Sequence, residues 1–141
     1  APPPAAKVGV LTYAQELVAG AATLLQEVPV AGEFFATFLA LEQLVDTAKS
    51  NKEELTVLLE LCDVVVKGVL ERCAERSSVL EESLRKLGKH VEGAKEVAQL
   101  CRGGAKQIFL SRKISKDIAA VRKNVLDFSV AINIVIGHDL H

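Results

Sequence analysis

Few residues of this 141-residue sequence have the types and the spacing that chemistry requires. Its three histidines, His90, His138 and His141, lack the spacing of zinc ligands, and no Glu-x-x-His pair indicates a di-iron centre in a helical bundle. The sequence also lacks a glycine-rich phosphate-binding motif and the Gly-x-Ser-x-Gly motif of a serine nucleophile. We therefore expect a protein that is not an enzyme, with no catalytic residues, no metal ligands and no cofactor.

The three cysteines are an odd number and form no Cys-x-x-Cys pair. Cys62 and Cys101 fall at apolar positions of helical repeats. Buried free thiols in a reducing compartment are the expected state of such residues.

The most distinctive polar feature is a basic stretch over residues 102–123, with seven basic residues and one acidic residue. The net charge of the whole chain is −1, so we do not expect nucleic acid as a partner. Anionic lipid head groups would attract the stretch by about 1 kcal/mol for each basic residue near the membrane surface. The alternative is an ordinary solvated face of the last two helices.

A helix predicted over residues 77–110 is the element around which the rest of the chain is organised. Its apolar and small residues recur at alternating gaps of four and three, which is the spacing of helices that pack lengthwise. One such stripe is not stable alone in water, so we expect other helices to cover it. The stripe consists of Leu80, Leu84, Leu87, Val91, Ala94, Ala98, Cys101, Ala105 and Ile108.

Helical periodicity also appears in four further segments. Pro29 separates the first two of them, and Ser50 with Glu53 predicts a capping box at the start of the third. We expect a bend at the Gly103–Gly104 pair and the end of the last helix at Gly137. The five predicted helices cover residues 8–28, 31–49, 51–75, 77–110 and 113–136.

No segment shows the alternation of a β-strand, and the connections are short. We therefore predict an all-α fold, an up-and-down four-helix bundle with an additional N-terminal helix. A long coiled coil is the rival architecture, but the breaks at Pro29 and Ser50 interrupt its seam. Residues 1–7 are expected to be disordered, residues 8–137 to form one bundle domain and residues 138–141 to be a tail. Because the sequence contains no Met, even at its start, we expect it to be part of a longer protein.

The last predicted helix is apolar nearly all round from Val125 to Ile136. Burial at the centre of the bundle would explain this, and contact with a lipid bilayer is the alternative. No apolar run approaches the roughly 18 residues of a transmembrane helix. The residues that widen the apolar surface are Val130, Ala131, Ile134 and Ile136.

Two segments of the chain resemble a known family. Residues 48–55, Ala-Lys-Ser-Asn-Lys-Glu-Glu-Leu, are similar to a turn between two helices in the N-terminal helical domain of mixed-lineage kinase domain-like protein. Residues 108–114, leading to residues 126–130, resemble the last helix pair of the same domain class. The class includes fungal HeLo-like adaptor domains and the N-terminal domains of plant helper immune receptors.

The resemblance implies a signalling or cell-death domain that self-associates and targets or permeabilises the plasma membrane. It implies a cytoplasmic protein that is recruited to this membrane on activation, that contacts another domain of its own chain and that engages anionic phospholipids with basic residues. The alternative is a protein–protein interaction adaptor that binds no lipid. The basic residues that match are Lys106, Arg112, Lys113, Lys116, Arg122 and Lys123.

Overall fold

The computed structural model describes residues 29–73, 77–102 and 108–139, and these residues form four α-helices without a strand among them. The prediction of an all-α bundle is therefore confirmed. The predicted helix over residues 8–28 and the predicted disordered segment 1–7 lie outside the described residues. The helices are α3 (Pro29–Asp46), α4 (Lys52–Cys73), α5 (Ser77–Leu100) and α6 (Ile108–Asp139).

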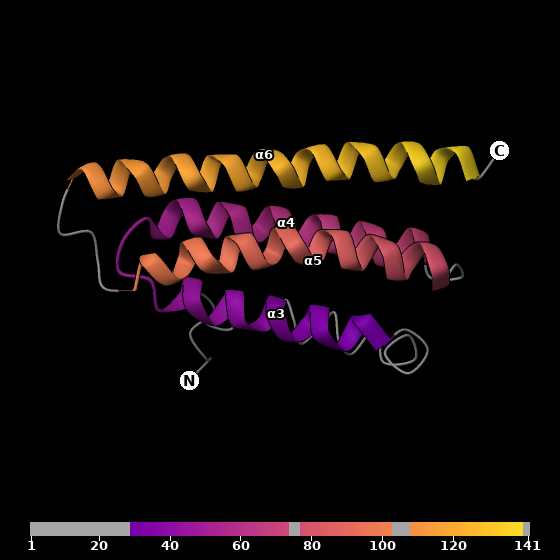
Figure 1. Cartoon of the computed structure of the whole chain (residues 1–141), viewed down its shortest axis with the longest axis horizontal. Coiled ribbons are helices and arrows are strands. Elements are labelled where there is room, and N and C mark those ends of the chain that lie inside the picture. Colours follow the sequence, from indigo (N-terminus) through magenta and orange to yellow (C-terminus); the bar gives the residue numbers. More distant parts are fainter. Residues whose placement is uncertain (1–28, 74–76, 103–107, 140–141) are drawn as a thin grey trace, which may run out of the picture.

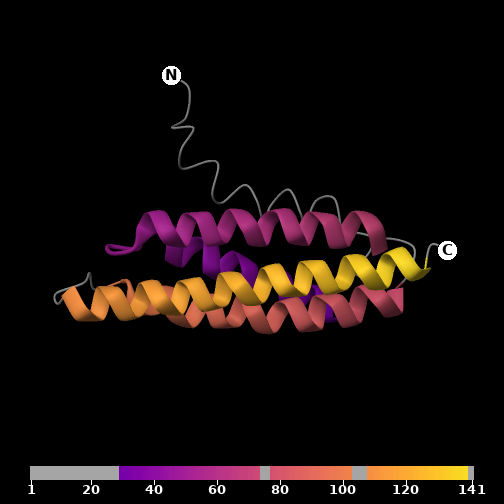
Figure 2. The same ribbon diagram turned by 90° about the horizontal axis from the view of Figure 1, so that it is seen from above.

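The four helices run up and down in chain order, with α3 and α6 at opposite edges of the bundle (Figure 1). Between these edges, α4 and α5 each pack against both α3 and α6. Consequently α4 and α6 run in the same direction, as the view from above also shows (Figure 2). At about 48 Å, α6 is longer than α4, which is about 33 Å long.

The apolar stripe of α5 forms the centre of the core, as its spacing predicts. Every described member of this stripe is fully buried, and the residues are Leu80, Leu84, Leu87, Val91, Ala94, Ala98 and Cys101. Three phenylalanine rings of α3 cover one end of it. The rings of Phe34 and Phe35 meet edge to face at 5.6 Å, and those of Phe34 and Phe38 stack at 6.2 Å. Such ring pairs add specific attraction to the area that they bury.

The start of α4 differs by one residue from the predicted capping box of Ser50 and Glu53. Asn51 precedes the helix, with a φ angle of 55°, a left-handed conformation that asparagine tolerates better than most residues. Its side-chain amide donates a hydrogen bond to Oε1 of Glu54 at 2.9 Å. The hydrogen-bonded pair at the start of α4 is therefore Asn51 with Glu54, and not the predicted pair of Ser50 with Glu53.

The prediction of one bent helix over residues 77–110 is wrong, because α5 ends at Leu100. The carbonyl group of Cys101 instead accepts hydrogen bonds from the backbone N–H groups of Lys49 and Ser50, at 2.9 and 3.3 Å. Two adjacent glycines, each costing about 1 kcal/mol in a helix, favour such a break over a bend. The last helix begins at Ile108, earlier than predicted, and continues through Gly137 to Asp139.

Candidate functional site: the basic face of α6

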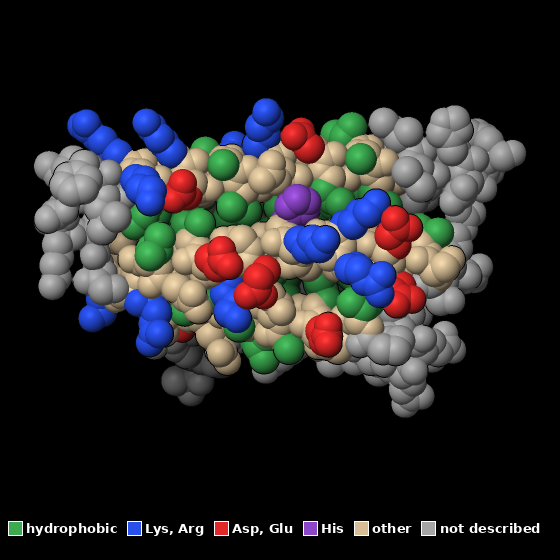
Figure 3. Space-filling view, viewed as in Figure 1, with side chains coloured by type: hydrophobic (Ala, Val, Ile, Leu, Met, Phe, Trp, Pro, Cys, Tyr) green, Lys and Arg blue, Asp and Glu red, His purple; other side chains and the backbone are tan. Residues whose placement is uncertain are grey.

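The predicted basic residues that the structure describes all lie on α6. Their side chains are exposed, and Lys and Arg side chains stand along the edge of the bundle that α6 forms (Figure 3). We call this group the basic face of α6, and it consists of Arg112, Lys113, Lys116, Arg122 and Lys123. The sixth predicted residue, Lys106, lies outside the described residues.

The apolar residues of α6 determine which side of this helix faces outward. Ile114, Ile118 and Val125 are buried in the core, and Phe128 and Ile132 pack partly buried against it. Because an α-helix turns once in 3.6 residues, these anchors leave the opposite side of α6 facing solvent. The basic side chains lie on that exposed side.

Two polar contacts with α4 fix α6 along its length. Near the start of α6, the Ser115 hydroxyl donates to Oε1 of Glu54 at 2.9 Å and accepts from the Asn51 amide at 3.1 Å. Farther along, Arg72 of α4 donates a hydrogen bond to the side-chain oxygen of Asn133. These contacts hold both halves of α6 at a defined height beside α4.

Within the basic face, three side chains form a line along the outermost edge of α6. Arg112, Lys116 and Lys123 are four and seven residues apart, a spacing that places them on one side of a helix. Arg122 is seven residues from Ser115 and therefore lies toward α4. Lys113 lies toward α5, because it is on the same side of α6 as Asn124, which is eleven residues later and lines a hollow between α5 and α6.

No acidic side chain neutralises the basic face within the part of the chain that the structure describes, where no carboxylate lies within 4.0 Å of any of its five cations. The cations of α5 differ, because Arg85 and Lys86 are paired with glutamates four residues earlier at 2.9 and 3.0 Å. The first turn of α6 also lacks an acidic residue. The dipole of α6 would favour an acidic residue in that turn.

The C-terminal half of α6 presents apolar side chains to solvent. Leu126 is 44% exposed, Val130 is 61% exposed, and Ala131 is also exposed. The prediction that this half is buried at the bundle centre is therefore wrong for Val130 and Ala131. The physical reason is that, among the described helices, α6 lies at an edge and packs mainly against α4 and α5, so these two helices bury one side of it.

A hollow of about 380 Å³ lies between α5 and α6. Its apolar wall includes Phe128, whose ring centre is 6.0 Å from that of His90, and Lys86 and Lys89 lie beside it. Burial lowers the pKa of His90. His90 is thus a half-buried residue that packs against α6.

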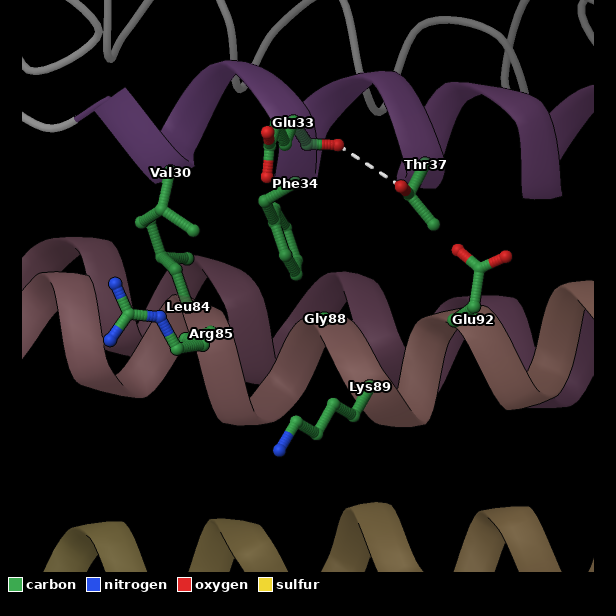
Figure 4. Close-up of a pocket in the computed structure, with 9 residues that line it drawn as sticks. All are labelled: Val30, Glu33, Phe34, Thr37, Leu84, Arg85, Gly88, Lys89 and Glu92. Carbon is green, nitrogen blue, oxygen red and sulfur yellow. Dashed lines mark hydrogen bonds between the residues drawn. The ribbon is translucent and has the colours of Figure 1, made fainter.

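A second hollow, of about 270 Å³, lies between α3 and α5 (Figure 4). It gathers charges of both signs, because Glu33 and Glu92 line it together with Arg85 and Lys89. The Thr37 hydroxyl donates to the backbone carbonyl of Glu33 at 3.0 Å and is thereby occupied.

Cys62 and Cys101 are buried free thiols, as expected, and Cys73 is buried as well. Burial raises the pKa of the Cys62 thiol to about 12, and the neighbouring Asp63 adds to this effect. A thiol with such a pKa is protonated at neutral pH and is a poor nucleophile. Over residues 29–73, 77–102 and 108–139, His, Cys, Asp and Glu side chains form no group of three that could hold a metal ion.

Sequence reasoning missed the exposure of two valines on α4. Val57 is 49% exposed and Val64 is 66% exposed. The signal in the sequence was that apolar residues occupy more of the circumference of α4 than one buried stripe needs.

No protein-family model, no curated protein and no solved structure matches this chain. The resemblance described above therefore remains a prediction from its motifs. None of the helices in the described part of the chain is long and apolar enough to cross a bilayer.

Proposed function

We propose that this bundle is a non-enzymatic module that binds the surface of membranes rich in anionic phospholipids through the basic face of α6. The observation that carries the proposal is that five exposed cations on one helix lack a neighbouring carboxylate within the described residues. Each such cation contributes about 1 kcal/mol of attraction to an anionic surface. Cations that are already paired, such as Lys86, contribute less.

The shape of the face supports contact with a flat surface. Arg112, Lys116 and Lys123 follow one line along α6, and the line continues into Leu126 and Val130, which are three and seven residues beyond Lys123. A helix that lies in the plane of a membrane combines cations with apolar side chains that enter the head-group region. This arrangement supports attachment to the membrane surface and does not require α6 to span it.

The biological role that we propose for this attachment comes from the resemblance alone. It is a signalling or cell-death function in which the module is recruited from the cytoplasm to the plasma membrane. The alternative, an adaptor that contacts proteins and not lipid, is favoured by the exposed valines of α4, which are not part of the basic face.

The test is co-sedimentation with vesicles of phosphatidylcholine alone and with vesicles that also contain phosphatidylserine or a phosphoinositide. We expect binding to the anionic vesicles only, and weaker binding at high salt because salt screens exposed charges. The variant R112E/K113E/K116E should lose this binding while keeping its helical circular dichroism spectrum.

The matched control is R85E/K86E/K95E on α5, which changes the net charge by the same amount at cations that are paired with glutamates. This control variant should retain most of the binding. Equal loss in both variants would indicate that net charge, and not the basic face, is responsible, and unchanged binding of R112E/K113E/K116E would overturn the proposal. Dye leakage from the same vesicles distinguishes permeabilisation from simple attachment.

A further inference from the structure

Exposed apolar side chains gather on the side of the bundle where α4 and α6 lie next to each other. Four of the six large apolar side chains that are exposed in the described residues belong to it, namely Val57, Val64, Leu126 and Val130. Val57 and Val64 are two helical turns apart on one side of α4. Between the two helices the surface is hollowed by about 210 Å³. We call this surface the α4–α6 face.

The contacts between α4 and α6 define their relative height. Glu54 is bonded to Ser115 and Arg72 is bonded to Asn133, and each pair is separated by 61 residues. The two helices are therefore parallel and in register, so that a residue of α4 is level with the residue of α6 that is 61 positions later. On this register Val64 is within one residue of the level of Leu126.

Acidic side chains border the face on the α4 side. Glu54 marks the edge of α4 that touches α6, and Leu61, seven residues later, lies on the same edge and is partly buried. Glu53 and Glu60 are also seven residues apart, are exposed and lie on the other side of the valines. Across the surface, the glutamates are thus followed by the valines of α4 and then by α6, where Leu126 and Val130 share one line with cations of the basic face.

We propose that a second copy of this chain covers the α4–α6 face, in a parallel two-fold pair in which α4 of each copy lies against α6 of the other. A two-fold axis parallel to the helices exchanges the two sides of the face but leaves heights unchanged. The apolar strip of one copy then meets the apolar strip of the other, with Val64 opposite Leu126 of the second copy. The exposed apolar area of each copy is removed from water by the same contact.

Charge complementarity favours a parallel second copy over an antiparallel pair or a lipid surface as the partner of the α4–α6 face. In the pair, Glu60 of one copy comes opposite the level of Arg122 and Lys123 of the other, within two residues on the register defined above. An antiparallel pair would instead place α4 against α4 and bring glutamates together, which is unfavourable. A lipid surface as the occupant would also have to accept Glu53 and Glu60.

The second charge contact repeats the first one near the start of both helices. Glu53 of one copy lies within two residues of the level of Arg112 and Lys116 of the other. Every contact occurs twice in a two-fold pair, so these modest surface attractions add up. The pair and the membrane would compete for the same side of α6, because the pair also uses residues of the surface proposed to bind lipid, namely Arg112, Lys116, Arg122, Lys123 and Leu126. Sedimentation without vesicles measures the pair alone and therefore separates its failure from a failure of lipid binding.

Cysteine cross-linking tests the parallel geometry, since the described native cysteines are buried. After mild oxidation, a mixture of the V64C and L126C variants should give a covalent dimer that contains one chain of each. V64C alone and L126C alone should remain uncrosslinked. L100C is the matched control, because Leu100 is 52% exposed and lies away from the face. Cross-linking of V64C to itself would overturn the parallel arrangement.

Charge exchange tests the same contact by sedimentation equilibrium of the full chain. We expect the wild-type chain to dimerise, and E60K and R122E each to weaken the dimer roughly tenfold. The double variant E60K/R122E should recover most of the loss, which a purely structural defect would not. Both positions are exposed, and circular dichroism verifies that the variants fold.

Two outcomes of the sedimentation experiment would overturn the proposal. One is a wild-type chain that stays monomeric at every concentration reached, and the other is a double variant that is no better than the single variants. If the chain is monomeric but V64D reduces its binding to anionic vesicles, the face contacts lipid and not a second copy.

Discussion

Arg72, in the last turn of α4, donates a hydrogen bond to the side-chain oxygen of Asn133 on α6. Together with the contact between Glu54 and Ser115, it fixes the height and rotation of the helix that carries the basic residues. The basic face therefore depends on contacts that are far from the cations themselves. This dependence can be measured.

Removing either partner of this bond should loosen the C-terminal half of α6. We expect R72A and N133A each to lower the free energy of unfolding by about 0.5–1 kcal/mol, because both side chains are exposed and water replaces part of the lost bond. The double variant should lose less than the sum of the two single variants. Urea denaturation measures all four proteins, and strictly additive losses would show that the contact contributes nothing to stability.

The central stripe of α5 should dominate stability. Leu87 is fully buried, so L87A removes a large side chain from a packed core and should cost about 2–5 kcal/mol. Leu100 on the same helix is half exposed, and L100A should cost less than about 1 kcal/mol. Urea denaturation of both variants gives the comparison. Similar losses in the two variants would contradict the assignment of the core.

Gly88 offers the opposite case, a position where an added methyl group should stabilise the protein. A Cβ atom there would lie 3.6 Å from a ring carbon of Phe34, which is an ordinary contact distance. Alanine is favoured over glycine within a helix by about 0.5–1 kcal/mol. We expect G88A to raise the midpoint of thermal unfolding, whereas a lower midpoint would mean that α3 and α5 cannot accommodate the methyl group.

The helices could be predicted from the sequence where a regular spacing of apolar residues marks the side that is buried. The stripe from Leu80 to Cys101 has the four-and-three spacing of packed helices, and its described members are all buried. The end of α5 could not be predicted, because the carbonyl of Cys101 bonds to Lys49 and Ser50, which are about fifty residues away in the chain. Such a bond leaves no trace in local periodicity.

The candidate site was predictable to a similar extent. The exposure of Arg112 or Lys123 follows from the cost of burying an unpaired charge. The exposure of Val64 and Val130 does not follow from residue type, because an apolar side chain is buried only if another helix lies over it. Which helices lie at the edges of a bundle is decided by the packing of the whole chain.

His90 should make the stability of the bundle depend on pH. Burial against α6 lowers the pKa of His90 below its ordinary value of 6.5, so the unfolded chain binds a proton at a higher pH than the folded chain. The free energy of unfolding should therefore fall as the pH decreases through 6.5 toward the lowered pKa, and it should be unaffected by His90 above that range. Urea denaturation at pH values on both sides of 6.5 measures this slope, and H90Q, which cannot be protonated, should reduce it. An identical slope in H90Q would assign the dependence to other groups.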